Sequence, residues 1–121
     1  MEPHILVADD DPDTCDLIRF FLQAAGFRVS ITRNPAEVLY LTSQEHFDVL
    51  LLDNWMPDIT GIELCQRIRV FDQFTPILFC SGAVTQADIE AATLAGAQGY
   101  VAKPFDPDVL ISELRNAIKM A

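Results

Sequence analysis

The sequence has few of the residues that characterise disulfide-bonded and zinc-binding proteins. It contains three cysteines and two histidines among 121 residues. Cys15, Cys65 and Cys80 form no CxxC pair, and His4 and His46 lie at no ligand-like spacing from them. This pattern argues against a zinc site. It predicts free cysteines that pack in the core of a protein from a reducing compartment.

Basic residues and long apolar runs are also scarce. Lysine and arginine total 8 against 18 acidic residues, which gives a formal net charge of −10. Such a charge argues against direct binding to nucleic acid, favours solubility, and permits a basic protein partner or a bound cation. No apolar run approaches the roughly 20 residues that span a membrane, and the N-terminus lacks the basic flank and apolar core of a signal peptide. We therefore expect a cytoplasmic protein without membrane contact.

What the sequence does contain is a regular alternation of short apolar strands and longer helices. Runs of aliphatic and β-branched residues predict strands at 4–8, 28–32, 49–52, 76–80 and 100–102. Helical spacing predicts helices at 12–25, 35–44, 61–71, 86–95 and from 107 onwards. Asp11 and Asn34 are expected to cap the first two helices, and Glu37 is placed to complete a capping box with Asn34. Without a repeat or a linker, residues 1–121 are expected to form one domain.

This alternation predicts an α/β fold. Strands that are joined by helices run parallel, and right-handed crossovers place helices on both faces of the sheet. Because five strand–helix units are too few for a closed eight-fold barrel, we expect an open, doubly wound (βα)5 sheet in the flavodoxin-like order 2-1-3-4-5. The helices are expected to bury residues at helical spacing, among them Leu17, Ala91, Ala92, Leu94, Ala95 and Val109.

Polar side chains follow four of the predicted strands. The third strand is an unbroken apolar run, 49–52, that leads directly into Asp53. Asp9 and Asp10 follow the first strand, Ser81 the fourth and Lys103 the fifth. In open parallel sheets the carboxyl ends of the strands meet at one edge, and ligands bind there. We therefore expect these side chains to converge on one pocket.

The chemistry of this set points to a metal ion and a phosphate. Three carboxylates in one pocket repel one another, and Mg²⁺ relieves the conflict by accepting one or two of them while keeping bound waters. Lys103 offers a positive charge and Ser81 a hydroxyl donor for phosphate oxygens. An aspartate can also act as a nucleophile that forms an acyl phosphate, and Asp53 occupies the central position. The set predicts Mg²⁺-dependent phosphoryl transfer.

The order and spacing of these residues have a family likeness. Over essentially the whole chain, the sequence resembles the receiver domain of two-component response regulators. The residues that carry the resemblance are Asp9-Asp10, Asp53-x-x-Met56-Pro57-x-x-x-Gly61, Ser81-Gly82, Ala95-Gly96-Ala97, Tyr100 and Lys103-Pro104-Phe105.

The resemblance implies a phosphoacceptor and a metal site. Asp53 would receive phosphate from a phosphohistidine on a sensor histidine kinase or a histidine phosphotransfer protein. Asp10, Asp53 and the backbone carbonyl of Trp55 would ligate Mg²⁺, and Asp9 would act through a water. The domain would be a regulatory phosphoacceptor rather than an enzyme, one that promotes its own phosphotransfer and slow autodephosphorylation.

The resemblance also implies a switch. Ser81 and Lys103 would bind the phosphoryl group, and Tyr100 would follow the Ser81 hydroxyl inward. The face formed by the fourth helix, the fifth strand and the last helix would then repack and change its contacts with a partner or with a second copy in a homodimer. The Lys103–Pro104 peptide bond would be cis, as is common in this family.

Two positions near the expected phosphorylation site are informative because they vary in such domains. Trp55 lies two residues after Asp53, and Ala83 lies two residues after Ser81. In this family these side chains flank the route of the water that hydrolyses the acyl phosphate. Neither a bulky apolar Trp55 nor a small Ala83 offers a group that orients this water. We therefore expect a long-lived phosphorylated state.

Other interpretations remain open at this point. The acidic residues after the first strand also suit the N-terminus of a helix through its dipole. The chain could be a phosphate-independent interaction module that kept the fold, or an aspartate-nucleophile phosphatase, for which Asp9-x-Asp11 has the formal pattern. Because the chain ends soon after the last predicted helix, it is either a stand-alone receiver or a piece of a longer protein.

Overall fold

A computed structural model describes residues 2–82 and 85–120, and it has the predicted alternation of strands and helices. The strands are His4–Ala8 (β1), Arg28–Thr32 (β2), Val49–Leu52 (β3), Ile77–Ser81 (β4) and Gly99–Ala102 (β5). The helices are Pro12–Ala24 (α1), Pro35–Gln44 (α2), Gly61–Phe71 (α3), Gln86–Ala95 (α4) and Pro107–Met120 (α5). The predicted fold class is therefore confirmed.

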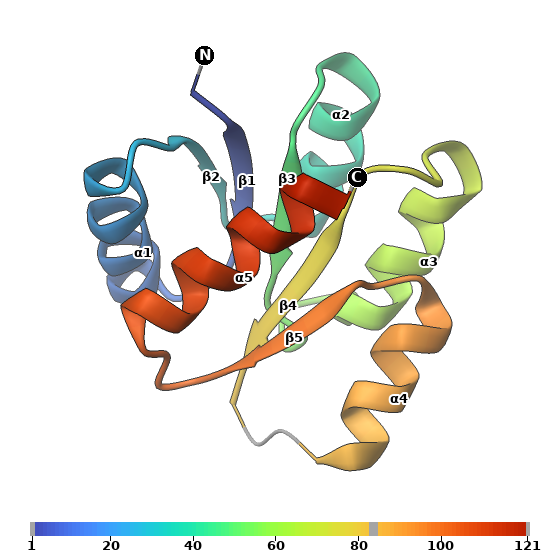
Figure 1. Ribbon diagram of the computed structural model, residues 1–121. Coiled ribbons are helices and arrows are strands. Elements are labelled where there is room, and N and C mark those ends of the chain that lie inside the picture. Colours follow the sequence, from blue (N-terminus) through green and yellow to red (C-terminus); the bar gives the residue numbers. More distant parts are fainter. Residues whose placement is uncertain (1, 83–84, 121) are drawn as a thin grey trace.

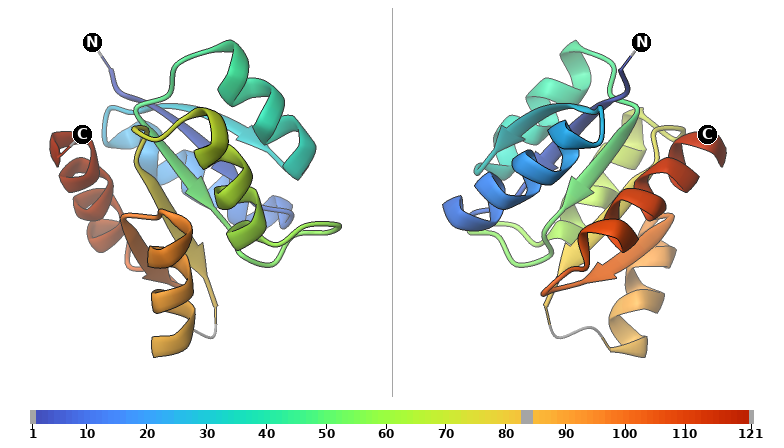
Figure 2. Two further views of the ribbon diagram at one scale, coloured as in Figure 1. Left: turned by 90° about the vertical axis from the view of Figure 1, so that its right-hand side faces the viewer. Right: turned by 60° about the vertical axis from the view of Figure 1, so that its left-hand side comes forward.

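The strands form one parallel sheet in the order β2-β1-β3-β4-β5, as expected. Figures 1 and 2 show that α1 and α5 cover one face of this sheet, while α2, α3 and α4 cover the other. The side chains of β1, β3 and β4 are buried along their whole length, because these central strands are sandwiched between two helical layers. A rigid, dry central strand therefore leads into Asp53.

Two apolar clusters fill the space between the sheet and its helical layers. One cluster joins α1 and α5 to the sheet through residues such as Ile18, Leu22 and Leu114. The other cluster joins α2, α3 and α4 to the opposite face, with Phe79 of β4 and Leu64 of α3 fully buried in it. Alternate residues of the strands serve the two clusters, because side chains in a strand point to opposite faces in turn.

The helix caps agree with the sequence patterns in part. The side chains of Asp11 and Asn34 accept hydrogen bonds from the backbone of α1 and α2. The capping box expected for Glu37 is absent among the hydrogen bonds of the described residues. The described structure instead has this motif at α4, where Thr85 and Asp88 bond to each other's backbone N–H groups.

Some residues expected in the core are exposed. Leu17 and Val109 are each about half exposed, because the buried stripes of α1 and α5 run along neighbouring residues on each helix. In α4, only Ala92 and Ala95 are buried, whereas Ala91 and Leu94 face outward. Contact with α3 accounts for the narrow stripe, since the Cys65 thiol donates to the carbonyl of Ala95 at a Sγ–O distance of 3.4 Å. None of the described helices has the length and apolarity that a membrane span requires.

Candidate functional site

Strand register brings Asp9 and Asp53 together at the carboxyl edge of the sheet. Ala8 of β1 pairs with Leu52 of β3, so the residues that follow them emerge side by side. The backbone N–H of Asp53 donates to the carbonyl of Ala8 over 2.9 Å, which continues the strand pairing into the loop. The expected convergence of the two carboxylates is thus a direct consequence of parallel pairing.

The same edge receives Ser81 and Lys103 from the other side of β3. Ser81 is the last residue of β4 and pairs with Ala102 of β5. The N–H of Lys103 donates to the carbonyl of Ser81 over 3.0 Å, and the Lys103–Pro104 peptide bond is cis. Four strand ends therefore deliver two acids, a hydroxyl and an ammonium group to one pocket.

The two carboxylate oxygens of Asp53 have different surroundings. Oδ1 accepts hydrogen bonds from the Ser81 hydroxyl at 3.1 Å and from the backbone N–H of Trp55 at 3.2 Å. Oδ2 lies 3.7 Å from the Lys103 ammonium, beyond hydrogen-bond distance. Asp53 is thus oriented through one oxygen, while the other faces a positive charge.

Asp9 is the main partner of Lys103. The ammonium group donates to Asp9 Oδ2 at 2.5 Å, and Asp9 Oδ1 accepts from the N–H of Asp11 at 3.0 Å. Burial opposes the charge on Lys103, but the hydrogen bond and the negative charges of Asp9 and Asp53 raise the lysine pKa above its ordinary value. Lys103 is therefore positively charged at neutral pH.

Asp53 itself is held in an unfavourable environment for a carboxylate. Burial raises its pKa above the ordinary aspartate value, and the charge of Asp9 adds to this. The Trp55 N–H, Lys103 and Ser81 oppose the shift without cancelling it. A carboxylate in such surroundings gains when positive charge enters the pocket.

The acids also have the chemistry of a divalent cation site. Asp9, Asp10 and Asp53 each offer one oxygen, and these oxygens lie within 4.8 Å of one another. Arg33 fixes the backbone of Asp10, because its Nε donates a hydrogen bond to the Asp10 carbonyl at 3.1 Å. Hard oxygen donors that are few in number and partly exposed suit Mg²⁺, which keeps several of its waters. The residues present therefore fit a magnesium ion.

Tyr100 lies on β5, and β4 separates it from β3, the strand that leads into Asp53. Its ring stacks against Phe79 at a centroid distance of 5.7 Å. Its hydroxyl is buried and has no hydrogen-bond partner among the described residues. A buried hydroxyl that lacks a partner costs free energy, so this hydroxyl is unsatisfied, and its strand pairs with β4, which carries Ser81.

The loop between β3 and α3 holds Asn54, a residue that the sequence patterns did not single out. Asn54 is buried, its carbonyl accepts from the N–H of Gly61 at 2.9 Å, and its side chain accepts from the N–H of Ile62 at 3.2 Å. A Cβ atom at Gly61 would lie 2.7 Å from the Asp53 carbonyl oxygen. Gly61 is therefore needed for a close backbone approach. Its spacing from Asp53 was the only sequence signal for this contact.

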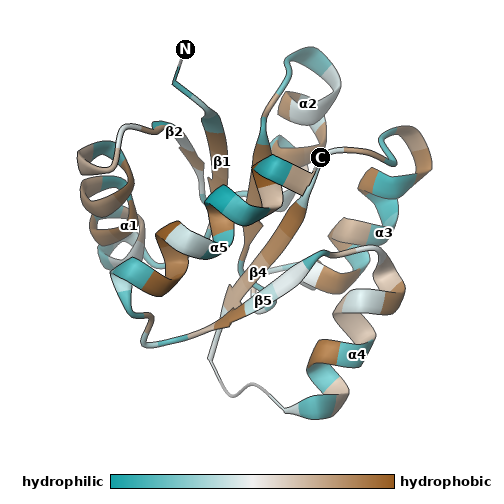
Figure 3. Cartoon of the chain, in the orientation of Figure 1, coloured by the Kyte–Doolittle hydropathy of each residue, from teal (hydrophilic) through white to brown (hydrophobic). Residues whose placement is uncertain are grey.

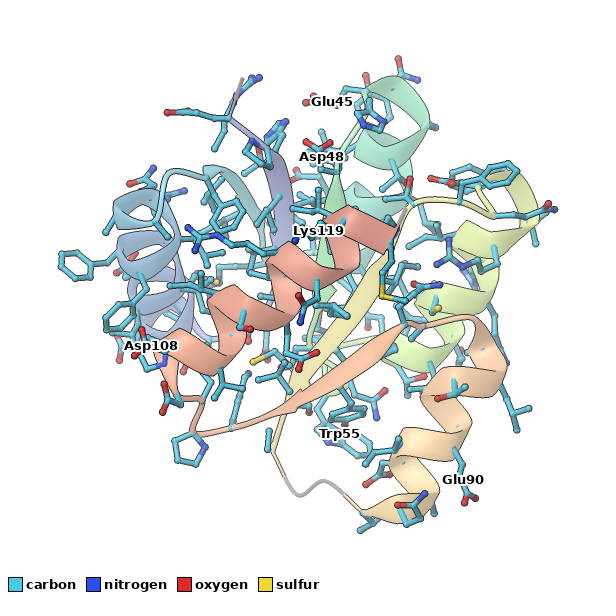
Figure 4. The ribbon with its side chains drawn as sticks, viewed as in Figure 1. Glu45, Asp48, Trp55, Glu90, Asp108 and Lys119 are labelled. Atoms are coloured by element: carbon cyan, nitrogen blue, oxygen red, sulfur yellow. The ribbon has the colours of Figure 1, made fainter. Side chains whose placement is uncertain are left out.

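Of the two positions expected to affect hydrolysis, Trp55 is 59% exposed, and its backbone N–H donates to Asp53. Figure 4 shows Trp55 at the end of the molecule opposite Glu45 and Asp48. Ala83 lies outside the described residues.

Comparisons with known proteins agree with this geometry. The model of the response regulator receiver domain family matches residues 5–115. The chain is 30% identical over 115 residues to the transcriptional regulatory protein TrcR of Mycobacterium tuberculosis, which covers 95% of this chain and 45% of TrcR. It is 38% identical over 109 residues to a 14.6 kDa protein of Leptolyngbya boryana, which covers 88% of this chain and 83% of the relative. The chain spans about half the length of most curated relatives that it matches.

A solved structure supports the same assignment. The chemotaxis response regulator CheY4 of Vibrio cholerae superposes with a TM-score of 0.91 at 28% identity, covering 97% of this chain and 99% of that one. The family match covers most of the chain, and the structural match extends over nearly the full length of both chains. The chain therefore belongs to the response regulator receiver domain family of two-component signalling.

Proposed function

We propose that Asp53 is the phosphoacceptor of a signalling switch and that residues 1–121 form one receiver domain. The convergence of four strand ends on Asp53 carries this proposal. Lys103 and Ser81 face different oxygens of this buried carboxylate, at 3.7 Å and 3.1 Å. Receiver domains work with histidine kinases, so the phosphoryl donor would be a phosphohistidine on a sensor kinase or a histidine phosphotransfer protein.

In the transfer step, an Asp53 carboxylate oxygen attacks the phosphorus atom of the phosphohistidine. The new P–O bond forms as the P–N bond breaks, and the electron pair leaves with the imidazole. Lys103 and the Ser81 hydroxyl would bind the phosphoryl oxygens as charge builds up on them. Fixed donors in a buried pocket act strongly because they do not need to reorient during the reaction.

Receiver domains bind Mg²⁺ at an acidic pocket. Here Asp10, Asp53 and the backbone carbonyl of Trp55 would hold the ion, with Asp9 acting through a water. When bound, the ion would supply positive charge that offsets the carboxylates and the phosphoryl oxygens. Lys103 already neutralises Asp9, so it would keep part of the pocket compensated before phosphorylation.

Phosphorylation would then change the surface. The Ser81 hydroxyl now bonded to Asp53 would turn toward the phosphoryl group, and Tyr100, which lacks a partner for its hydroxyl in the described structure, would follow it. This repacks the α4-β5-α5 face and alters contacts with a partner or a second copy. The domain is regulatory, and we propose slow autodephosphorylation, a cytoplasmic location and no direct contact with nucleic acid or membrane.

The test is phosphorylation with acetyl phosphate and Mg²⁺, followed by intact-mass measurement. The wild type should gain one phosphoryl group, and Asp53→Asn should gain none. Asp58→Asn is the matched control, because Asp58 is exposed in the same loop and asparagine tolerates its φ of 73°. Modification that survives in Asp53→Asn but is lost in Asp9→Asn would indicate phosphatase chemistry instead.

A second measurement separates a switch from a passive interaction module. Beryllofluoride with Mg²⁺ should change the fluorescence of Trp55, because the backbone N–H of Trp55 donates to Asp53 and its exposed indole senses a change in that loop. The Asp53→Asn variant should give no such change. An unchanged signal in the wild type, together with absent phosphorylation, would favour a phosphate-independent module.

A further inference from the structure

The end of the sheet opposite Asp53 carries an apolar groove, which we call the Phe74 groove. It consists of two adjoining hollows that share Phe74 and Pro76. One hollow, of about 240 Å³, lies against α5 and is lined by Leu78, Glu113 and Met120 as well as the shared pair. The other, of about 530 Å³, extends toward Asp48 and Asp72. The groove is thus built by segments far apart in the sequence.

Large apolar side chains stand exposed at this groove. Phe74 and Met120 are exposed to 86% and 87%, although both belong to residue types that gain most from burial. Figure 3 shows brown, hydrophobic segments at the end of α3 and in the loop that follows it, close to the C-terminal end of α5. Val70 and Phe71, in the last turn of α3, are also exposed. Large exposed apolar side chains that line a groove mark an interaction site.

Hydrogen bonds to Asp72 hold the loop that carries the exposed Phe74. Asp72 Oδ1 accepts hydrogen bonds from the N–H groups of Phe74 and Thr75, each at 3.0 Å. Asp72 Oδ2 accepts from the Thr75 hydroxyl at 2.5 Å. These bonds fix the backbone of the loop at Phe74, so binding of a partner would cost little free energy for ordering the loop.

The groove is lined by acidic residues, which favours a cationic partner. Asp48, Asp72 and Glu113 are the acids that line the two hollows, and His46 is the other ionisable residue there. Neither hollow has a lysine or an arginine among its described lining residues. Lys119, on the last turn of α5, instead lines a hollow on the side of Pro3 and Phe27. A second copy of this chain would bring its own charge of −10 to an acidic rim, which opposes self-association.

We propose that the Phe74 groove docks an amphipathic, cationic segment of a partner protein. The segment inserts an aliphatic or aromatic side chain between Phe74 and Met120, and it places lysines or arginines beside Asp48, Asp72 and Glu113. The groove lies at the other end of the sheet from the phosphorylation pocket, and Figure 4 shows Asp48 far from Trp55. Docking there therefore takes place away from the phosphorylation pocket, although the groove shares α5 with the α4-β5-α5 face.

The test uses a synthetic helical peptide of about 18 residues, or five turns, made of leucine and lysine with one leucine stripe. A second peptide has the same composition in shuffled order and thus the same charge without the stripe. Amide chemical shifts are followed with saturating Mg²⁺, which limits binding of lysine at the acidic pocket. The striped peptide should shift residues 70–76 and 113–120 and should bind more tightly than the shuffled one.

Two variants make the result specific. Phe74→Ser should weaken binding of the striped peptide by about ten-fold or more, as expected for an apolar anchor. Its melting temperature should stay unchanged, because the side chain is already exposed. Phe20→Ser is the matched control, since Phe20 is 67% exposed on α1, and it should bind as the wild type does.

Three outcomes would overturn the proposal. The first is equal affinity for the striped and shuffled peptides, which would mean attraction by charge alone. The second is unchanged binding by Phe74→Ser. The third is concentration-dependent self-association that Phe74→Ser removes, measured by sedimentation, which would assign the groove to a second copy.

Discussion

The two ends of the β-sheet both bury polar side chains, but they satisfy them differently. At the amino end, His4 is buried, and its ring Nε2 lies 2.6 Å from the Ser30 hydroxyl. The backbone N–H of His4 donates to the Asp48 carboxylate at 2.7 Å. At the carboxyl end, Asp9 and Asp53 share one pocket, and Lys103 is the cation that pairs with both among the described residues.

This difference separates stability from function within one fold. At the amino end, buried His4 is matched with Ser30 and Asp48, and the acids Asp48, Asp72 and Glu113 line an open groove rather than share a buried pocket. The carboxyl end gathers carboxylates in a space where burial raises the pKa of Asp53. A pocket left with such a conflict responds strongly when a cation or a phosphoryl group enters it. The predictions below test whether the two ends differ in this way.

The largest effect should come from Lys103→Met. Loss of the ammonium group leaves buried Asp9 unpaired and removes a donor for the phosphoryl group. We expect phosphorylation by acetyl phosphate to slow by about 100-fold or more. The free energy of unfolding should fall by about 2 kcal/mol, a value reduced from that of a fully buried pair because the lysine side chain is partly exposed. Lys119→Met, at an exposed position on α5, is the control, and equal losses in both variants would show that the effect is not specific to the carboxyl end.

Gly61→Ala should destabilise the carboxyl end through packing alone. The added Cβ would lie 2.6 Å from the Phe79 ring and 2.7 Å from the carbonyl oxygen of Asp53. Overpacking of this kind costs about 1–3 kcal/mol, measurable by denaturant unfolding. Gly82→Ala is the matched control, because a Cβ at Gly82 meets nothing within 4 Å. Similar losses in both variants would mean that steric crowding at Gly61 is not the cause.

Trp55→Asn should shorten the life of the phosphorylated state. An amide beside the pocket can orient the attacking water, whereas the indole cannot. We expect dephosphorylation with Mg²⁺ to become about ten-fold faster, which corresponds to roughly 1.4 kcal/mol in activation free energy. Tyr40→Asn removes another exposed aromatic residue away from the pocket and should leave the decay unchanged. An unaltered decay rate in Trp55→Asn would refute the role of the indole.

The smallest effect should be a pH dependence of stability at the amino end. Burial, then the charge of Arg28, lowers the pKa of His4 below its ordinary value, although Glu45 and Asp48 oppose this and His46 adds to it. The unfolded chain, with a histidine pKa near about 6.5, then binds more protons than the folded chain just below that pH. The contribution of neutral His4 to stability is therefore fully present above the unfolded-state pKa, and it is lost as the pH falls below that value toward the lower pKa of the folded state.

Thermal unfolding across that window measures the effect. The dependence of stability on pH should become weaker in His4→Gln and should persist in His46→Gln, since His46 is exposed at the surface. A slope of the opposite sign, or one that His46→Gln abolishes, would contradict the assignment to His4.

Local patterns in the chain predicted most of the element boundaries. Helical spacing placed α3 and α4 at the residues where they occur, because this signal depends on neighbours within a few positions. The fourth strand begins at Ile77 rather than Pro76, since proline has no N–H to donate to the ladder, and it extends to Ser81 through pairing with Ala102. The pocket was also foreseeable, because residues that follow parallel strands must meet at one edge.

Long-range packing decided the rest. The exposed positions of Leu17 and Leu94 depend on which stripe of each helix the sheet or a neighbouring helix covers. The Phe74 groove forms because α5 brings Met120 to a loop more than forty positions earlier in the chain. The spacing of apolar residues in the sequence indicates which residues share a face of one helix or strand. It does not indicate which distant elements come into contact, because those contacts form only when the sheet assembles. The acids of the pocket were therefore visible in the sequence, while the Phe74 groove and the Asn54–Gly61 contact beneath Asp53 were not.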